Sequence, residues 1–345
     1  MGTQGSLISR RLLGGLGVAV AIAPLVACRG RDRASVLRSL VREVVADLAQ
    51  DMLVTSRTLH ETLRQLAQAP DAASAGAARA ALVAALTAWK RASAFRSGPF
   101  ASSHAFQRAA FWPARPIAIQ RVLAADDAID EARVEGLAVD AKGLYALEYS
   151  LFEPTFEKLL ESPGEMAAKR LRRYALEVAK NVRGYGQRVV RQLGDDGAYA
   201  RAFAADGQRS LSELVAQEVD TLAMLGGKLA RIPRADALAE PRAMAVEGYF
   251  SRSSLQVALA LLSGAERLYS GGGGGGMSTL AGAVSETLDA ELRAGFHDCA
   301  TRLRALGKPL DVAFDTDQQA YTAVGSSIEA LQHSLKVNLA SALEV

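Results

Sequence analysis

Apolar residues recur at helical spacing along most of this chain, and that periodicity limits the possible folds more than any other feature. One example is the series Leu37, Leu40, Val41, Val44, Val45 and Leu48, which has charged residues between its members. Residues three and four positions apart line one face of a helix. Alternating runs of Val, Ile and Thr, which favour strands, are missing from the sequence. The pattern therefore predicts an all-α fold.

Glycine, proline and polar clusters divide the pattern into helices. We expect these over residues 36–66, 78–95, 142–152, 165–193, 208–230, 244–269, 280–306 and 316–342, with a further helix opened by Trp112-Pro113 and a polar loop over 126–136. The segment from Gly194 to Gly197 is the best candidate boundary. Long helices with short connections are typical of antiparallel bundles. We therefore predict two packed helical bundles, residues 36–195 and 196–345, and their similar helix content suggests a pseudo-duplicated pair.

The N-terminus has the layout of an export signal. Arg10 and Arg11 are the only charges before Cys28, and the apolar stretch Leu12–Ala27 is loosened by glycines. A bilayer span needs about 20 apolar residues, so this stretch is short for one. A charged start, a short apolar run and a small residue before the cut indicate a signal peptide over residues 1–27. The alternatives are an uncleaved membrane anchor and a cytosolic protein with an unusual N-terminus.

The end of that stretch, Leu25-Val26-Ala27-Cys28, resembles a bacterial lipobox. In such lipoproteins the cysteine thiol is acylated and the chain is cut before it. The resemblance implies a lipid on Cys28, a lipidated tether over residues 28–35 and attachment to a membrane as a partner. It places the protein in the bacterial cell envelope, facing the periplasm, at the outer membrane rather than the inner one. Export by either the general or the twin-arginine route is compatible with the sequence.

The charge balance argues against nucleic acid as a partner. Lys and Arg total 40 against 37 Asp and Glu, and two of the Arg lie in the signal, so the remaining chain is close to neutral. Nucleic-acid binding calls for a basic face or stripe.

Known catalytic motifs fail on inspection. His60-Glu61 begins like the zinc-peptidase HExxH motif, but Arg64 stands where the second histidine is required. No Gly-x-Ser-x-Gly nucleophile motif is present. We therefore assign no catalytic residue, and the sequence favours a protein that is not an enzyme.

Several segments, taken in order, resemble the imelysin family, which is also filed as a peptidase family and as iron-regulated envelope proteins. The resemblance spans nearly all of the chain after the signal. It rests on segments that contain Trp89, Gly98-Pro99, Trp112-Pro113, Gly143 to Phe152, Glu247 to Ser254 with Ser251, and Leu268 to Gly271.

The family signature, Gly-x-His-x-x-Glu, is altered here. Gly143 and Glu148 are present, but Tyr145 replaces the histidine. Residues three apart share one side of a helix, and the resemblance implies that Tyr145 and Glu148 are the candidate metal ligands. A phenolate beside a carboxylate would favour ferric iron over zinc. In the other interpretation, which we prefer, Tyr145 fills the vacated space and hydrogen-bonds Glu148.

Three functions follow from the resemblance. The first is a binding component in iron or other metal acquisition, with envelope iron-uptake partners and a site in a cleft near residues 143–148, where the two halves meet. The second is a metallopeptidase of the imelysin type. The third is a non-catalytic, partner-docking lipoprotein with a degenerate metal site.

Overall fold

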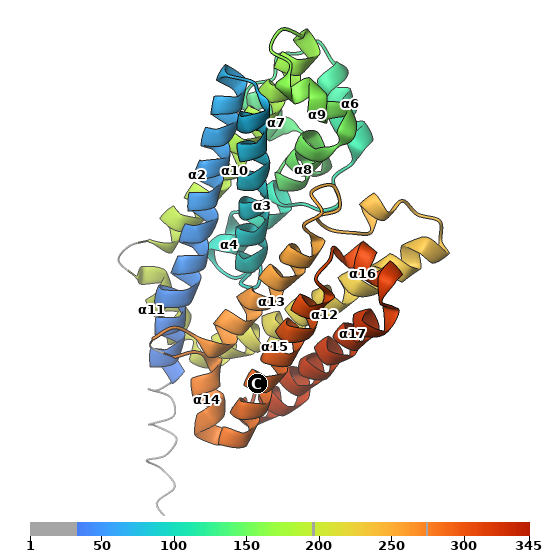
Figure 1. Ribbon diagram of the computed structural model, residues 1–345. Helices are drawn as coiled ribbons and strands as arrows, with labels where there is room; N and C mark the ends of the chain where they lie inside the picture. The colour runs from blue at the N-terminus through green and yellow to red at the C-terminus, as the bar shows by residue number, and fades with distance from the viewer. Residues whose placement is uncertain (1–32, 195–196, 274) are drawn as a thin grey trace, which may run out of the picture.

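A computed structural model describes residues 33–194, 197–273 and 275–345 (Figure 1). The signal and Cys28 lie outside these residues. Helices account for nearly all of the described chain, and within it no strand is found beyond a single bridge between Gly272 and Gly275. The all-α prediction is confirmed. Residues 33–35, which we assigned to the tether, are already helical.

The N-terminal half is built on three long helices. Residues 33–39 run into the π-helical segment η1 (Leu40–Val45) and then α2 (Ala46–Gln68), which lies between α3 (Ala72–Ala92) and α10 (Met166–Leu193). Figure 1 shows α6, α7, α8 and α9 gathered at one end of the molecule. The shorter elements of this half are α4 (Pro99–Ser102), α5 (Ala105–Ala109), α6 (Pro116–Ala124), α7 (Glu131–Gly136), η2 (Val139–Ala141), α8 (Leu144–Phe152) and α9 (Pro154–Glu161).

The C-terminal half is a four-helix arrangement. Its long helices are α12 (Gly207–Ala237), α13 (Ser254–Ser270), α15 (Glu286–Leu306) and α17 (Gln318–His333). Each of α12, α13, α15 and α17 packs against two of the others, so the four enclose a common core. The remaining elements are α11 (Ala198–Ala205), η3 (Arg242–Met244), α14 (Met277–Val284), α16 (Leu310–Thr316), η4 (Ser334–Leu339) and α18 (Ala340–Leu343).

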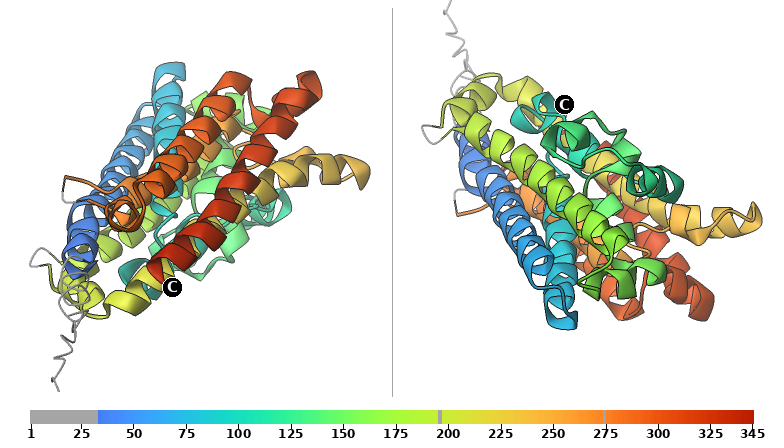
Figure 2. Two further views of the ribbon diagram at one scale, coloured as in Figure 1. Left: turned by 90° about the horizontal axis from the view of Figure 1, so that it is seen from below. Right: turned by 90° about the horizontal axis from the view of Figure 1, so that it is seen from above.

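The two halves meet where α13 crosses α3. Figure 2 shows the first, blue helices and the last, red helices on opposite sides of the molecule. Gly264 of α13 lies against the backbone of α3, where a Cβ on Gly264 would overlap the carbonyl oxygen of Arg91. The buried apolar residues of both halves form one continuous core. The division near residue 195 therefore stays a prediction, because the core does not stop there.

Helix α3 is long and apolar enough to cross a membrane by composition alone. In the structure it packs against α2, α8 and α13 and buries Leu82, Leu86 and Trp89. It is a core helix of the fold.

Capping residues explain several differences from the predicted helix boundaries. The Asp71 carboxylate accepts a hydrogen bond from the Ser74 amide at 2.7 Å, so α3 begins six residues earlier than predicted. Asp130 caps α7 within the segment that we expected to be a loop. Ser285 caps α15 and so divides the helix expected over 280–306 into α14 and α15. Pro116, rather than Pro113, occupies the first turn of α6.

The helix expected over residues 244–269 begins only at Ser254. Gly248 has φ +78° and Arg252 has φ +57°, and neither value is compatible with a right-handed helix. The segment 245–253 is consequently a turn, which carries Glu247 and Ser251 towards α8.

Candidate functional site

The start of α8 depends on a glycine. Gly143 has φ +85°, and a Cβ at this position would lie 2.7 Å from the carbonyl oxygen of Ala109 in α5. Only glycine combines this backbone conformation with such a close approach. Gly143 therefore fixes where α8 begins and, with it, the positions of Tyr145 and Glu148.

Tyr145 and Glu148 are buried on α8 and face the turn of residues 245–253 from the other half. The Tyr145 hydroxyl donates a hydrogen bond to Glu247 Oε1. Glu148 Oε1 accepts hydrogen bonds from the Ser251 amide at 3.0 Å and from Ser251 Oγ at 2.7 Å. The structure thus brings together Tyr145, Glu148, Glu247 and Ser251. Our interpretation that Tyr145 fills space fits its burial, but the hydrogen bond expected with Glu148 is made to Glu247, because the turn inserts beside the phenol.

Two lysines complete this group. Lys90 Nζ of α3 lies 2.5 Å from Glu247 Oε1, and Lys228 Nζ of α12 lies 2.5 Å from Glu247 Oε2. Lys90 also lies 5.8 Å from the centre of the Tyr145 ring. We call Lys90, Tyr145, Glu148, Lys228 and Glu247 the lysine–carboxylate cluster. It connects α3 and α8 of the first half with α12 and the 245–253 turn of the second.

The cluster sets the charges of its members. Burial alone would raise the pKa of Glu247, but the ammonium groups of Lys90 and Lys228 outweigh it and lower this pKa to about 2. Burial, together with the charge of Lys228, lowers the pKa of Lys90 to about 8 against the opposing pull of Glu247. Burial and the Glu247 carboxylate raise the pKa of Tyr145 well above its ordinary value, so the phenol stays protonated.

Glu148 carries a pH dependence. Burial is the main cause that raises the pKa of Glu148 to about 7, against hydrogen bonds from Ser251 that lower it. The folded state thus holds a proton on Glu148 that the unfolded chain releases near pH 4.5. The contribution of Glu148 to stability should therefore fall by about 3 kcal/mol as the pH rises between these values. Glu247, with a pKa of about 2, and Lys90, with a pKa of about 8, titrate outside the range from pH 4.5 to pH 7.

We expect Glu148→Gln to flatten this profile. The measurement is urea unfolding of the variant and the original chain from about pH 4.5 to about pH 8. The difference between the two free energies of unfolding should change by about 3 kcal/mol across the window. Glu291→Gln, an exposed substitution, is the matched control. A constant difference would show that Glu148 ionises as freely in the fold as in the unfolded chain.

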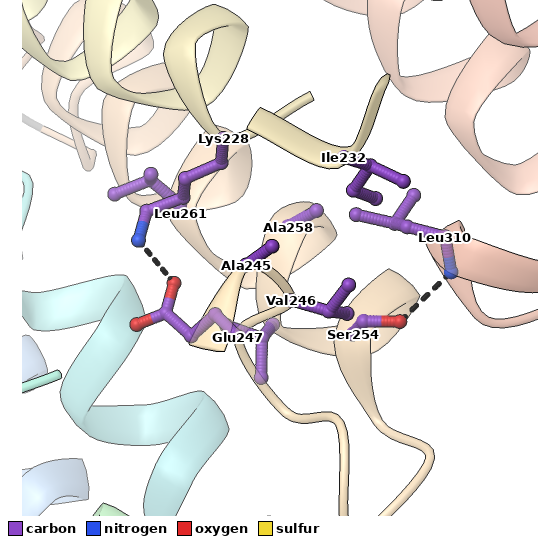
Figure 3. Close-up of a pocket in the computed structure, with 10 residues that line it drawn as sticks. Lys228, Ile232, Ala245, Val246, Glu247, Ser254, Ala258, Leu261 and Leu310 are labelled. Atoms are coloured by element: carbon purple, nitrogen blue, oxygen red, sulfur yellow. Dashed lines mark hydrogen bonds and ion pairs between the residues drawn. The ribbon is translucent and has the colours of Figure 1, made fainter. Parts of the chain in front are cut away.

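The cavity beside Glu247 is small. Figure 3 shows Lys228 reaching Glu247 on one side and Ser254 accepting the Leu310 amide hydrogen bond, 2.8 Å long, on the other. The enclosed volume is about 10 Å³, and the remaining lining is mostly apolar. A cavity of that size is at the limit for one water molecule. This cavity therefore has no room for a larger ligand, and the cleft expected near residues 143–148 stays a prediction.

The other motif positions have structural surroundings. Trp89 is buried, and its Nε1 donates to Ser56 Oγ at 2.8 Å. Gly98 has φ +52° and lies under the Tyr199 ring, and Pro99 begins α4.

Trp112 is the motif position beside the cluster. Its ring centre lies 4.6 Å from Lys228 Nζ and 4.9 Å from the Arg231 guanidinium carbon. Cations at these distances interact favourably with the ring face. Pro113 follows Trp112 outside any helix.

Lys90 and Lys228 were missed as site residues. Lys90 is four residues after the buried Leu86, and Lys228 is three residues after the buried Leu225. A lysine in the buried stripe of a helix requires a partner of opposite charge. The helical spacing could therefore have marked both lysines as paired with a carboxylate, but it does not identify which carboxylate.

The cluster does not fit a metal ion. Among residues 33–194, 197–273 and 275–345, no three His, Cys, Asp or Glu side chains gather into a metal-binding group. The two carboxylates present are already bound by Ser251 and by two ammonium groups. Ammonium groups within a few ångströms repel a further cation.

This fold and motif correspond to a known protein class. Residues 45–337 match the family profile described as Imelysin, Peptidase_M75. The chain belongs to the imelysin family, as the sequence resemblance predicted. No curated protein matches the sequence.

Two solved structures share the fold. A candidate iron-regulated protein A precursor from Parabacteroides distasonis aligns with a TM-score of 0.76 at 17% identity, covering 91% of this chain and 95% of its own. An imelysin-like protein from Psychrobacter arcticum aligns with a TM-score of 0.73 at 14% identity, covering 92% and 96%. The imelysin-like bundle architecture is therefore confirmed over nearly the whole described chain.

Proposed function

We propose that this chain is an envelope-anchored imelysin-family lipoprotein that works by binding a partner protein, without holding a metal at its motif and without peptidase activity. The observation that carries this proposal is the pairing of Glu247 with both Lys90 and Lys228. A site that already contains its own cations has no charge left to attract a metal ion.

An iron-linked role is part of the proposal. The Parabacteroides distasonis neighbour is described as iron-regulated, and the family resemblance implies iron or other metal acquisition. In this chain, we propose, that role is exercised through envelope iron-uptake partners rather than through an ion bound at Tyr145 and Glu148.

The peptidase alternative has little support from the described side chains. His60 lies 3.1 Å from an Arg183 nitrogen, and Arg64 forms a 2.5 Å ion pair with Glu61 on the surface of α2. The HExxH-like segment is thus a solvated, cationic helix face.

The anchor is proposed from sequence. The lipobox-like ending at Cys28 supports acylation, cleavage and attachment to the outer membrane, facing the periplasm. One acyl chain binds membranes only marginally, whereas several give stable anchoring.

Metal content tests the proposal directly. We expect protein extracted from membranes to carry far less than one metal ion per chain by elemental analysis, and its intact mass to show an acylated Cys28 without residues 1–27. Titration with ferrous, ferric or zinc ions should produce no binding heat. A stoichiometric metal that is lost in Glu148→Gln would overturn the proposal.

Complementation of a deletion strain distinguishes the partner-docking function from the metal-binding alternative. Under iron limitation, a strain without the gene should grow poorly, and the Glu148→Gln variant should restore growth as well as the original chain does. Failure of a folded Glu148→Gln protein to restore growth would support the metal-holding alternative.

A further inference from the structure

We infer that the Lys90 ammonium stands in for a metal ion: it is a built-in cation that binds Glu247 Oε1, an oxygen atom that a divalent ion would otherwise take. The same place should become a divalent-metal site when Lys90 is shortened and an imidazole replaces the Tyr145 phenol. The inference deepens the proposed function, on which it rests for the statement that the native site holds no metal.

The argument begins with one oxygen atom. Glu247 Oε1 accepts the Tyr145 hydroxyl and lies 2.5 Å from Lys90 Nζ. Lys90 and Tyr145 therefore share a single carboxylate oxygen deep in the protein. A metal ligand at position 145 would need that same oxygen, or the space in front of it, for its ion.

The second step concerns charge. Two carboxylates, Glu148 and Glu247, are buried close enough to raise the pKa of Tyr145 together. Buried carboxylates require opposite charge nearby. For Glu247 that charge comes from lysine side chains of α3 and α12. Glu148 is bound by Ser251 instead. Either a tethered ammonium group or a bound metal ion can balance the buried negative charge. The presence of one excludes the other, because both need the same oxygen.

The third step distinguishes the two lysines. Lys228 binds the other oxygen, Oε2, and also lies over the half-buried Trp112 ring, towards the surface. Lys90 lies over the Tyr145 ring and binds Oε1. Removing Lys90 thus frees the oxygen nearest residue 145, whereas removing Lys228 does not.

The test compares zinc binding by three variants, measured by calorimetry and repeated with cobalt(II), whose visible absorption reports coordination by the protein. Lys90→Ala with Tyr145→His should bind one zinc ion, through the imidazole, Glu148 and Glu247. Tyr145→His alone should bind at least about 100-fold more weakly, because the ammonium repels the ion. Lys90→Arg with Tyr145→His is the matched control, since it keeps the cation, and should not bind.

Each outcome has a definite meaning. Equal zinc affinity of Tyr145→His with and without Lys90 would overturn the inference, as would a folded double variant that binds no zinc. Stoichiometric binding by the original chain would overturn the proposed function as well, so the two failures are distinguishable.

Should the double variant not fold, Lys90→Ala alone provides the test. Propylammonium, which matches the missing Cγ–Nζ end of the lysine, should raise the melting temperature of this variant more than tetramethylammonium does. It should have no such effect on the original chain. Equal effects of the two cations on Lys90→Ala would overturn the inference.

Discussion

Glu247→Gln should lower the free energy of unfolding by about 3–5 kcal/mol. Among the described residues, Glu247 is the only carboxylate within ion-pair distance of Lys90 and Lys228, so its loss leaves two largely buried ammonium groups side by side. The glutamine amide oxygen can still accept a hydrogen bond from the Tyr145 hydroxyl. The loss of stability would therefore come from the missing charge and not from a change of side-chain shape.

Urea denaturation at neutral pH measures this effect. Glu240→Gln, a substitution at an exposed position of the same half, is the control and should change stability little. Replacing Glu247, Lys90 and Lys228 together by Leu, Met and Met should cost less than Glu247→Gln alone, since no unpaired charge remains. A loss below about 1 kcal/mol for Glu247→Gln, comparable to that of a surface pair, would show that the cluster is effectively solvated.

Gly264→Ala should strongly destabilise the protein, with an expected loss of about 3 kcal/mol or more in the free energy of unfolding. The new Cβ would overlap the Arg91 carbonyl oxygen of α3 and lie 2.9 Å from Ala94 Cβ. The overlap is with backbone, which cannot rotate away, so α13 must separate from α3.

Gly227→Ala provides the comparison. Gly227 lies within α12, and nothing lies within 4 Å of a Cβ built there. Alanine favours the helix over glycine by about 1 kcal/mol, so this variant should be slightly more stable. Thermal unfolding of the two variants should therefore shift in opposite directions, and a stable Gly264→Ala protein would contradict the close crossing of α3 and α13.

Helix content could be predicted from the sequence, because the apolar spacing is a local property. The helix ending at Leu193 and the α8 helix around Leu147 were found within a few residues. Boundaries failed where one residue decided them. Asp71 caps a helix that begins inside the gap expected between two helices. Ser285 caps a helix within a stretch whose apolar pattern continues, and Gly248 breaks a pattern that looks helical by spacing alone.

The site was half predictable. Tyr145 and Glu148 followed from a short motif in one helix, and Glu247 and Ser251 from a second motif. Their contacts, however, depend on a turn that brings position 247 to Lys90 of a distant helix. Such pairing between remote segments leaves no periodic trace in the sequence, so the ammonium groups that change the chemistry of the site could not be assigned.

Replacement of the family histidine by Tyr145 acquires a physical meaning in this arrangement. An imidazole would offer a metal an open nitrogen, whereas the phenol keeps its proton and donates a hydrogen bond to Glu247. The loss of the histidine and the presence of Lys90 thus both disfavour metal binding.

The sequence contains two tryptophans, and one of them, Trp112, lies next to the lysine–carboxylate cluster. Trp89 precedes Lys90 on α3 and is buried, while Trp112 is half-buried beneath Lys228 and Arg231. An indole in an apolar interior emits at shorter wavelength than one near water, and a neighbouring ammonium group quenches emission. The protein therefore carries its own optical probe at this place. Any partner that moves Lys228 should change the emission of Trp112 without a dye, a label or a metal.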